Sequence, residues 1–281
     1  MYDFHFDEKK KILNDPENFL IFVKKLLPRW LNGIPDSECL AIFKILQKRK
    51  IGKNTVAIET GCGASTLAFF LHCCLNKTKF FSWDTNGSKG SYLRTIINES
   101  ICQPLNVNVN DIWKFIPYFS TDKYAGIQIL KELNLKTDFG FFDSSHTLLQ
   151  VQSEIKEFEK VSSNNFYIAL DDAYYTKKKI NFTFLNIIRT KLKLKRVEEP
   201  KDNKCLPFYE EIYTYLNKKY KKVYKVDDYY KKNFHKDDWF NYYKEVKDYG
   251  VSSYDKKFTN KTLKTNKKKI SHRFDAFFIK K

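Results

Sequence analysis

Residues 55–71, Thr-Val-Ala-Ile-Glu-Thr-Gly-Cys-Gly-Ala-Ser-Thr-Leu-Ala-Phe-Phe-Leu, predict a buried strand, a glycine turn and the first two turns of a helix. Residues 56–58 form a short apolar run of the kind that is buried in a parallel sheet. Gly61 and Gly63 allow a sharp turn and a close approach of the backbone to a ligand. Because Glu59 stands just before them, the stretch predicts a βα unit whose turn carries an acid at the strand end.

The acid decides between two kinds of ligand for this turn. A dinucleotide would place its pyrophosphate at the helix N-terminus, but Thr66 occupies the position of the third glycine of that fingerprint. Glu59 would also repel a doubly anionic pyrophosphate. S-adenosylmethionine has no phosphate and carries a sulfonium and an α-ammonium, so an acid suits it better. Residues 80–84, Phe-Phe-Ser-Trp-Asp, then form a second apolar strand, and Asp84 at its end is placed to accept hydrogen bonds from ribose hydroxyls.

Over residues 52–175 the chain resembles the class I S-adenosylmethionine-dependent methyltransferases, whose first motif is E-x-G-x-G and whose second is an acid ending the next strand. The resemblance implies an α/β fold with a Rossmann-like, mostly parallel sheet and an antiparallel last strand, which residues 273–279 would supply. It also implies that S-adenosylmethionine is the cofactor. The residues that would bind it are Glu59, Gly61, Gly63, Ser65 and Asp84.

A second informative stretch brings more acids to the same edge of the predicted sheet. Residues 138–143 form a strand that ends in Asp143, and residues 166–170 form a strand that ends in Asp171 and Asp172. Ligands bind at the carboxyl ends of such strands. Three carboxylates that converge there would repel one another unless a cation neutralises them, and oxygen ligands suit Mg²⁺ or Ca²⁺.

This pattern is similar to that of the metal-dependent O-methyltransferases of the catechol and macrocin types. Carried over by position, the resemblance makes Asp143, Asp171 and Asp172 ligands of a divalent cation. Asp143 and His146 would be the catalytic residues, because some relatives have a histidine at that position. The alternative is that Asp171 and Asp172 cap a turn or helix while His146 lies in the first turn of a helix. Both interpretations stay open.

Composition and charge limit the function classes. The net charge of +18 raises the hypothesis of a nucleic-acid ligand, but only six of the 51 basic residues are arginine, the bidentate reader of phosphate and guanine. The scarcity of arginine disfavours a nucleic-acid acceptor, and the resemblance to the metal-dependent O-methyltransferases implies O-methylation of a small-molecule or sugar hydroxyl. A methyltransferase acting on RNA or protein, or a non-catalytic S-adenosylmethionine-binding protein, are the alternatives. The six cysteines have no zinc-like spacing and indicate free thiols in a reducing compartment, here the cytoplasm.

The expected organisation is an N-terminal helical cap, residues 1–50, and a methyltransferase domain, residues 51–281. A Lys- and aromatic-rich insertion is expected at residues 227–271. The periodicity predicts helices at 92–102, 147–161 and 180–194, and strands at 105–109 and 223–226. No apolar run is long enough for a membrane span. The oligomeric state is left open.

Overall fold

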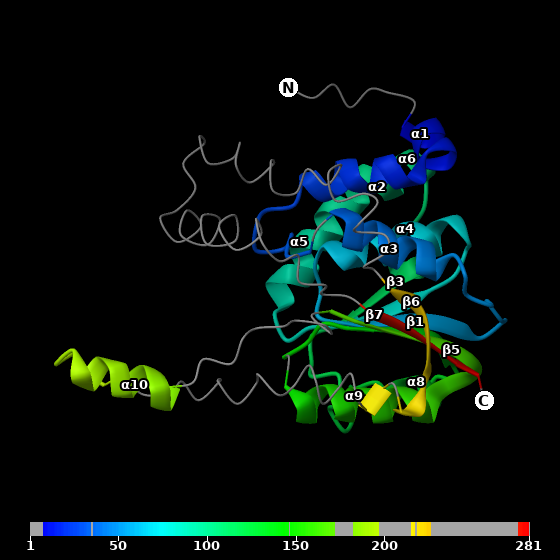
Figure 1. Ribbon diagram of the computed structural model, residues 1–281. Helices are drawn as coiled ribbons and strands as arrows, with labels where there is room; N and C mark the ends of the chain where they lie inside the picture. Colours follow the sequence, from blue (N-terminus) through cyan, green and yellow to red (C-terminus); the bar gives the residue numbers. More distant parts are fainter. Residues whose placement is uncertain are drawn as a thin grey trace.

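The computed structural model describes residues 8–34, 36–145, 147–171, 182–196, 215–216, 218–225 and 275–280. In this part of the chain a seven-stranded sheet has the order β3-β2-β1-β4-β5-β7-β6 (Figure 1). The strands are β1 (Thr55–Thr60), β2 (Phe80–Trp83), β3 (Trp113–Ile116), β4 (Lys136–Phe142), β5 (Ser162–Leu170), β6 (Lys221–Lys225) and β7 (Asp275–Lys280). Strands β1 to β5 are parallel, and β7 is antiparallel to both β5 and β6.

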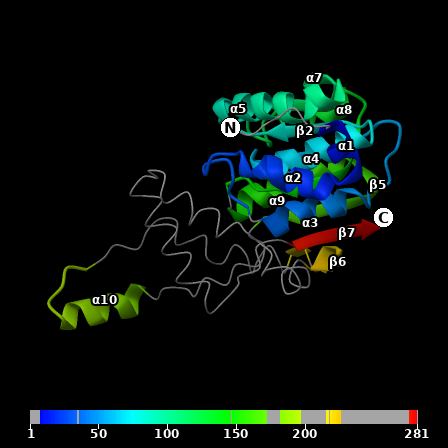
Figure 2. The same ribbon diagram turned by 90° about the horizontal axis from the view of Figure 1, so that it is seen from above.

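Helices cover both faces of the sheet. The described helical segments are α1 (Glu8–Asn14), α2 (Pro16–Lys25), α3 (Asp36–Leu46), α4 (Ala64–Leu75), α5 (Gly87–Ile97), a π-helical turn η1 (Asn98–Cys102), α6 (Gln103–Leu105), α7 (Val109–Ile112), α8 (Ile129–Glu132), α9 (Leu148–Val161) and α10 (Phe182–Lys191). Figure 1 shows α2, α3 and α4 above the sheet and α8 and α9 below it. In both views α10 lies away from the sheet (Figures 1 and 2).

The core is divided by the sheet into two apolar layers, because successive side chains of a strand point to opposite faces. On β1, Ala57 packs in the layer of the N-terminal helices and α4, whereas Val56 and Ile58 pack in the layer of α9. On β2, Phe80 and Phe81 divide in the same way. Both faces of these parallel strands are therefore buried, as their continuous apolar runs predict.

Helix α9 is built as its sequence predicts. The side chain of Thr147 accepts a hydrogen bond from the Gln150 amide at 3.4 Å and caps the helix. Apolar residues at helical spacing along it, among them Val151, Ile155 and Phe158, are buried against the sheet. The strand at β5 and the antiparallel β7 are likewise confirmed.

Two predictions about the region after β2 have different outcomes. Residues 92–102 are helical as predicted, in α5 and η1, but α5 begins earlier, at Gly87, because the side chain of Asn86 accepts a hydrogen bond from the Ser88 amide and caps the helix. The strand expected at 105–109 is a turn, since Asn106 has a left-handed φ of 54° and Asn108 caps the short α7. The third strand lies at 113–116 instead.

The remaining predictions are met in part. Helix α10 falls within the helix predicted at 180–194, and β6 overlaps the strand predicted at 223–226 but begins earlier, at Lys221. The insertion at 227–271 and Cys205 lie outside the described residues. The other five cysteines are free thiols.

The division into a cap and a domain stays a prediction, although α1 to α3 precede β1 and share one core with α4. None of the described helices is both long and apolar enough to cross a membrane.

Candidate active site

The glycine turn after β1 is held by the ends of the neighbouring strands. Gly61 has a φ of +82°, which L-residues with side chains rarely adopt, and its amide donates to the Trp83 carbonyl at 2.8 Å. A Cβ at this position would lie 2.0 Å from the Asp143 carbonyl oxygen. A Cβ at Gly63 would lie 3.0 Å from the Leu31 carbonyl oxygen. The turn is therefore packed between the end of β4 and the segment that joins α2 to α3.

Glu59 is fully buried behind this turn and holds it in place. Its carboxylate accepts hydrogen bonds from the hydroxyls of Ser65, Thr66 and Ser82, at 2.9, 2.7 and 2.6 Å. The Ser82 hydroxyl in turn accepts the indole N–H of Trp113 at 2.7 Å. Burial raises the pKa of Glu59 to about 7, although the three hydroxyls favour its charged form.

This arrangement shows what Glu59 does in the fold. The acid joins β1 to the first turn of α4, through Ser65 and Thr66, and to β2, through Ser82. The predicted cofactor ligands Glu59 and Ser65 thus contact each other in the structure. A direct contact of either with a cofactor stays a prediction.

Asp84 lies beside the turn, at the end of β2. Its carboxylate accepts the amides of Cys62 at 2.9 Å and Asn86 at 2.8 Å, and it forms an ion pair with Lys89 at 3.0 Å. Its side chain is 9% exposed and that of Lys89 is 28% exposed. The predicted ribose acid and the glycine turn are therefore brought together. Lys89 is not among the residues predicted from the sequence, although a lysine in the first turn of the helix that begins at Gly87 is a signal for it.

The acids after β4 and β5 lie at the same edge of the sheet as the glycine turn. Phe142 pairs with Leu170 in register at the ends of the two strands. The Asp143 amide then donates to the Thr60 carbonyl at 2.9 Å, and the Asp171 amide donates to the Phe142 carbonyl at 3.2 Å. Within the described residues the Asp171 Oδ1 atom is buried without a hydrogen-bond partner.

The proposed metal set is only partly described. His146 and Asp172 lie outside the described residues. Among the residues that the structure does describe, no group of three His, Cys, Asp or Glu side chains could hold a metal ion. The carboxylates of Asp143 and Asp171 are hard oxygen donors of the kind that Mg²⁺ and Ca²⁺ prefer. The cation itself stays a prediction.

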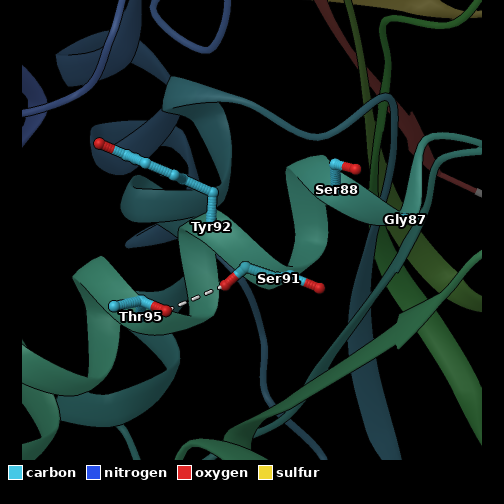
Figure 3. Close-up of a pocket in the computed structure, with 5 residues that line it drawn as sticks. All are labelled: Gly87, Ser88, Ser91, Tyr92 and Thr95. Atoms are coloured by element: carbon cyan, nitrogen blue, oxygen red, sulfur yellow. Dashed lines mark hydrogen bonds between the residues drawn. The ribbon is translucent and has the colours of Figure 1, made fainter.

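A shallow depression runs along α5, the helix that begins next to Asp84. Five residues line it: Gly87, Ser88, Ser91, Tyr92 and Thr95 (Figure 3). Figure 3 shows the Tyr92 ring extending from α5 toward the N-terminal helices, and this ring meets Trp30 edge-on with centroids 5.8 Å apart. Both rings are partly exposed, so the depression is open to solvent beside the predicted ribose site.

Comparison with known proteins gives similarity of structure only. No family model matches the chain, and no curated protein matches it. An O-methyltransferase from Bacillus cereus in complex with S-adenosylhomocysteine has 14% identity and a TM-score of 0.45, covering 73% of this chain and 83% of its own. S-adenosylhomocysteine-bound methyltransferase PaMTH1 from Podospora anserina has 16% identity and a TM-score of 0.45, covering 79% and 92%. The calicheamicin methyltransferase CalS11 has 12% identity and a TM-score of 0.42, covering 59% and 75%.

The strand order and register of the chain itself carry the fold assignment. Five parallel strands place the glycine turn, Asp84, Asp143 and Asp171 at one edge of the sheet, and β7 returns antiparallel beside β5. The chain therefore has the Rossmann-like fold of the class I S-adenosylmethionine-dependent methyltransferases, as its sequence predicts.

Proposed function

We propose that the protein is an S-adenosylmethionine-dependent methyltransferase that methylates a hydroxyl of a small molecule or sugar. The observation that supports this most strongly is the turn at Gly61. It runs between a buried acid and the N-terminus of α4, with Asp84 beside it and Asp143 packed against it. A cofactor laid across this turn could place its ribose at Asp84 and its methyl group on the side of Asp143.

The chemistry is an in-line displacement. The acceptor oxygen forms a bond to the methyl carbon while the carbon–sulfur bond breaks, and the sulfonium leaves as a neutral thioether. The main contribution of the protein is to align oxygen, carbon and sulfur. The hydroxyl proton must go to a base, and Asp143 and His146 are our candidates for that role.

A divalent cation is a further part of the proposal. Asp143, Asp171 and Asp172 would hold it, and the buried Asp171 Oδ1 atom without a hydrogen-bond partner is compatible with an oxygen ligand. When bound, such a cation lowers the pKa of an acceptor hydroxyl and fixes its position.

The first test is calorimetric titration with S-adenosylhomocysteine, with and without Mg²⁺. We expect micromolar binding that weakens at least about tenfold in Asp84→Asn, roughly 1.4 kcal/mol. Asp15→Asn is the matched control, because Asp15 caps α2 and asparagine caps a helix equally well. If the wild type binds NAD and not S-adenosylhomocysteine, the proposal is wrong and an oxidoreductase becomes the better hypothesis.

Turnover separates an enzyme from a non-catalytic binding protein. Transfer of the labelled methyl group from S-adenosylmethionine would be measured with a catechol, a deoxysugar nucleotide and an oligosaccharide as acceptors. Asp143→Asn should abolish transfer and leave S-adenosylhomocysteine affinity unchanged. Near-wild-type transfer by this variant would remove Asp143 from the mechanism.

Two alternatives concern the acceptor, which could be an RNA or a protein. If an RNA or a protein is the acceptor, transfer to total RNA or to a protein extract will exceed transfer to the small molecules. A steep loss of RNA affinity with rising salt concentration would favour RNA as the acceptor, given the net charge of +18.

A cytoplasmic location of the protein stays a prediction from the cysteine usage.

A further inference from the structure

A buried acid on α9 connects two loops of the candidate site. Glu154 is fully buried. Its carboxylate accepts hydrogen bonds from the Ser120 hydroxyl, from the Ser144 hydroxyl at 2.9 Å and from the Gln150 side-chain amide at 3.2 Å. The Gln150 amide also lies 3.3 Å from the Ser120 hydroxyl. The four side chains form one hydrogen-bonded network.

The network joins parts of the chain that strand pairing does not join. Ser120 lies in the loop after β3, and Ser144 lies in the loop after β4. In the sheet β3 and β4 are separated by β2 and β1. Glu154, from α9, therefore connects two loops that follow strands that are not neighbours.

The loop after β4 carries a residue of the candidate site. Ser144 directly follows Asp143, the proposed base. Ser120 directly follows Tyr118 and Phe119, two aromatic residues after the carboxyl end of β3 that are 55% and 66% exposed. The loop after β3 is itself compact, since the Ser120 carbonyl accepts the Ile127 amide at 2.7 Å.

Burial of a carboxylate is costly unless its oxygens are fully hydrogen-bonded, and an apolar side chain would fill the space without that cost. Neutral donors from two loops and from α9 supply these hydrogen bonds. An acid that accepts from both loops at once fixes their relative position, which an apolar residue would not do.

We propose that Glu154 is a positioning residue: it holds the loop after β3 in fixed register with the loop after β4, and thereby keeps Asp143, the proposed base, in its place. The proposal rests on the proposed function for its catalytic consequence. Its structural content, the coupling of the two loops, is independent of that function. A misplacement of about 1 Å at a reacting group can lower a rate about 10²-fold.

The test compares Glu154→Ala with Glu154→Gln and with Glu157→Ala. Glutamine keeps an oxygen acceptor, and serine hydroxyls can accept its N–H. Glu157 lies on the same helix but pairs at the surface with Lys160, so it is the matched control. Three quantities are measured: amide hydrogen exchange by mass spectrometry, the Kd of S-adenosylhomocysteine, and kcat with the acceptor found active above.

In Glu154→Ala we expect exchange to become at least about fivefold faster in residues 117–127 and in residues 143–145, while residues 64–75 stay protected. We expect kcat to fall at least about tenfold. The Kd of S-adenosylhomocysteine should stay within about twofold of wild type. Glu154→Gln should restore slow exchange and most of kcat, and Glu157→Ala should match wild type.

Other outcomes would overturn the inference. If exchange in Glu154→Ala rises only within α9, or in only one of the two loops, the acid does not couple them. If both loops loosen and kcat is unchanged, the coupling has no role in alignment. If the wild type binds no S-adenosylhomocysteine and transfers no methyl group, the proposed function fails, and the exchange comparison alone decides the coupling.

Discussion

Replacing Glu59 with glutamine should make the protein more stable at pH 8 and leave its stability nearly unchanged at pH 4.5. The folded chain raises the pKa of Glu59 from 4.5 to about 7 because the carboxyl group is fully buried. The folded state therefore binds this proton more tightly than the unfolded state does. The stability that protonation contributes is fully present below pH 4.5 and is lost as the pH rises through about 7.

The magnitude follows from the shift of the pKa. A change of one pKa unit corresponds to about 1.36 kcal/mol, so a rise from 4.5 to about 7 corresponds to roughly 3 kcal/mol. Glutamine does not ionise, and its carbonyl oxygen and amide can satisfy the hydroxyls of Ser65, Thr66 and Ser82. The glutamine variant should therefore not lose this roughly 3 kcal/mol of stability as the pH rises through about 7.

The assay is urea unfolding of wild type and variant at several pH values from 4.5 to 8. The difference between the two free energies of unfolding removes the contributions of the other titrating groups. Glu17→Gln is a control for the loss of one charge, since Glu17 pairs at the surface with Lys44. A difference that does not change with pH, or a variant that is less stable at pH 8, would refute the reasoning. At pH 8 the wild type therefore keeps a charged acid behind the turn at the expense of stability.

Two other changes test the packing around the site. Gly61→Ala should lower the free energy of unfolding by at least about 2 kcal/mol and abolish S-adenosylhomocysteine binding. The reason is that φ is +82° at this position and the new Cβ would overlap the Asp143 carbonyl. A variant with the melting temperature and affinity of wild type would contradict this prediction. Arg49→Ala should cost about 3–5 kcal/mol in urea unfolding, because it leaves the buried Asp138 without its ion-pair partner at 2.8 Å. The double variant with Asp138→Leu should recover much of that loss, and failure to recover would show that the pair is not what the single change disrupts.

The local features of the site could be predicted from the sequence. An apolar run, an acid and two glycines specify a strand, a turn and a helix through short-range conformational preferences. The same reasoning found the strand ends at Asp84, Asp143 and Asp171 and the helix cap at Thr147. The strand expected at 105–109 was wrong because the left-handed Asn106 and the cap at Asn108 form a turn there. Asparagine at turns competes with apolar patterning over so short a segment.

The partners of the buried acids could be learned only from the tertiary structure. Glu59 meets Ser82, Arg49 meets Asp138, and Glu154 meets Ser120, pairs that lie 23, 89 and 34 residues apart in the chain. No local pattern predicts such pairs, because they depend on which strands are neighbours and on how the helices pack over them. By itself the sequence determined the order of the elements and the residues that reach the carboxyl edge of the sheet. The tertiary structure decided which side chains behind that edge hold those residues in place, because only packing brings distant polar groups close enough to satisfy one another.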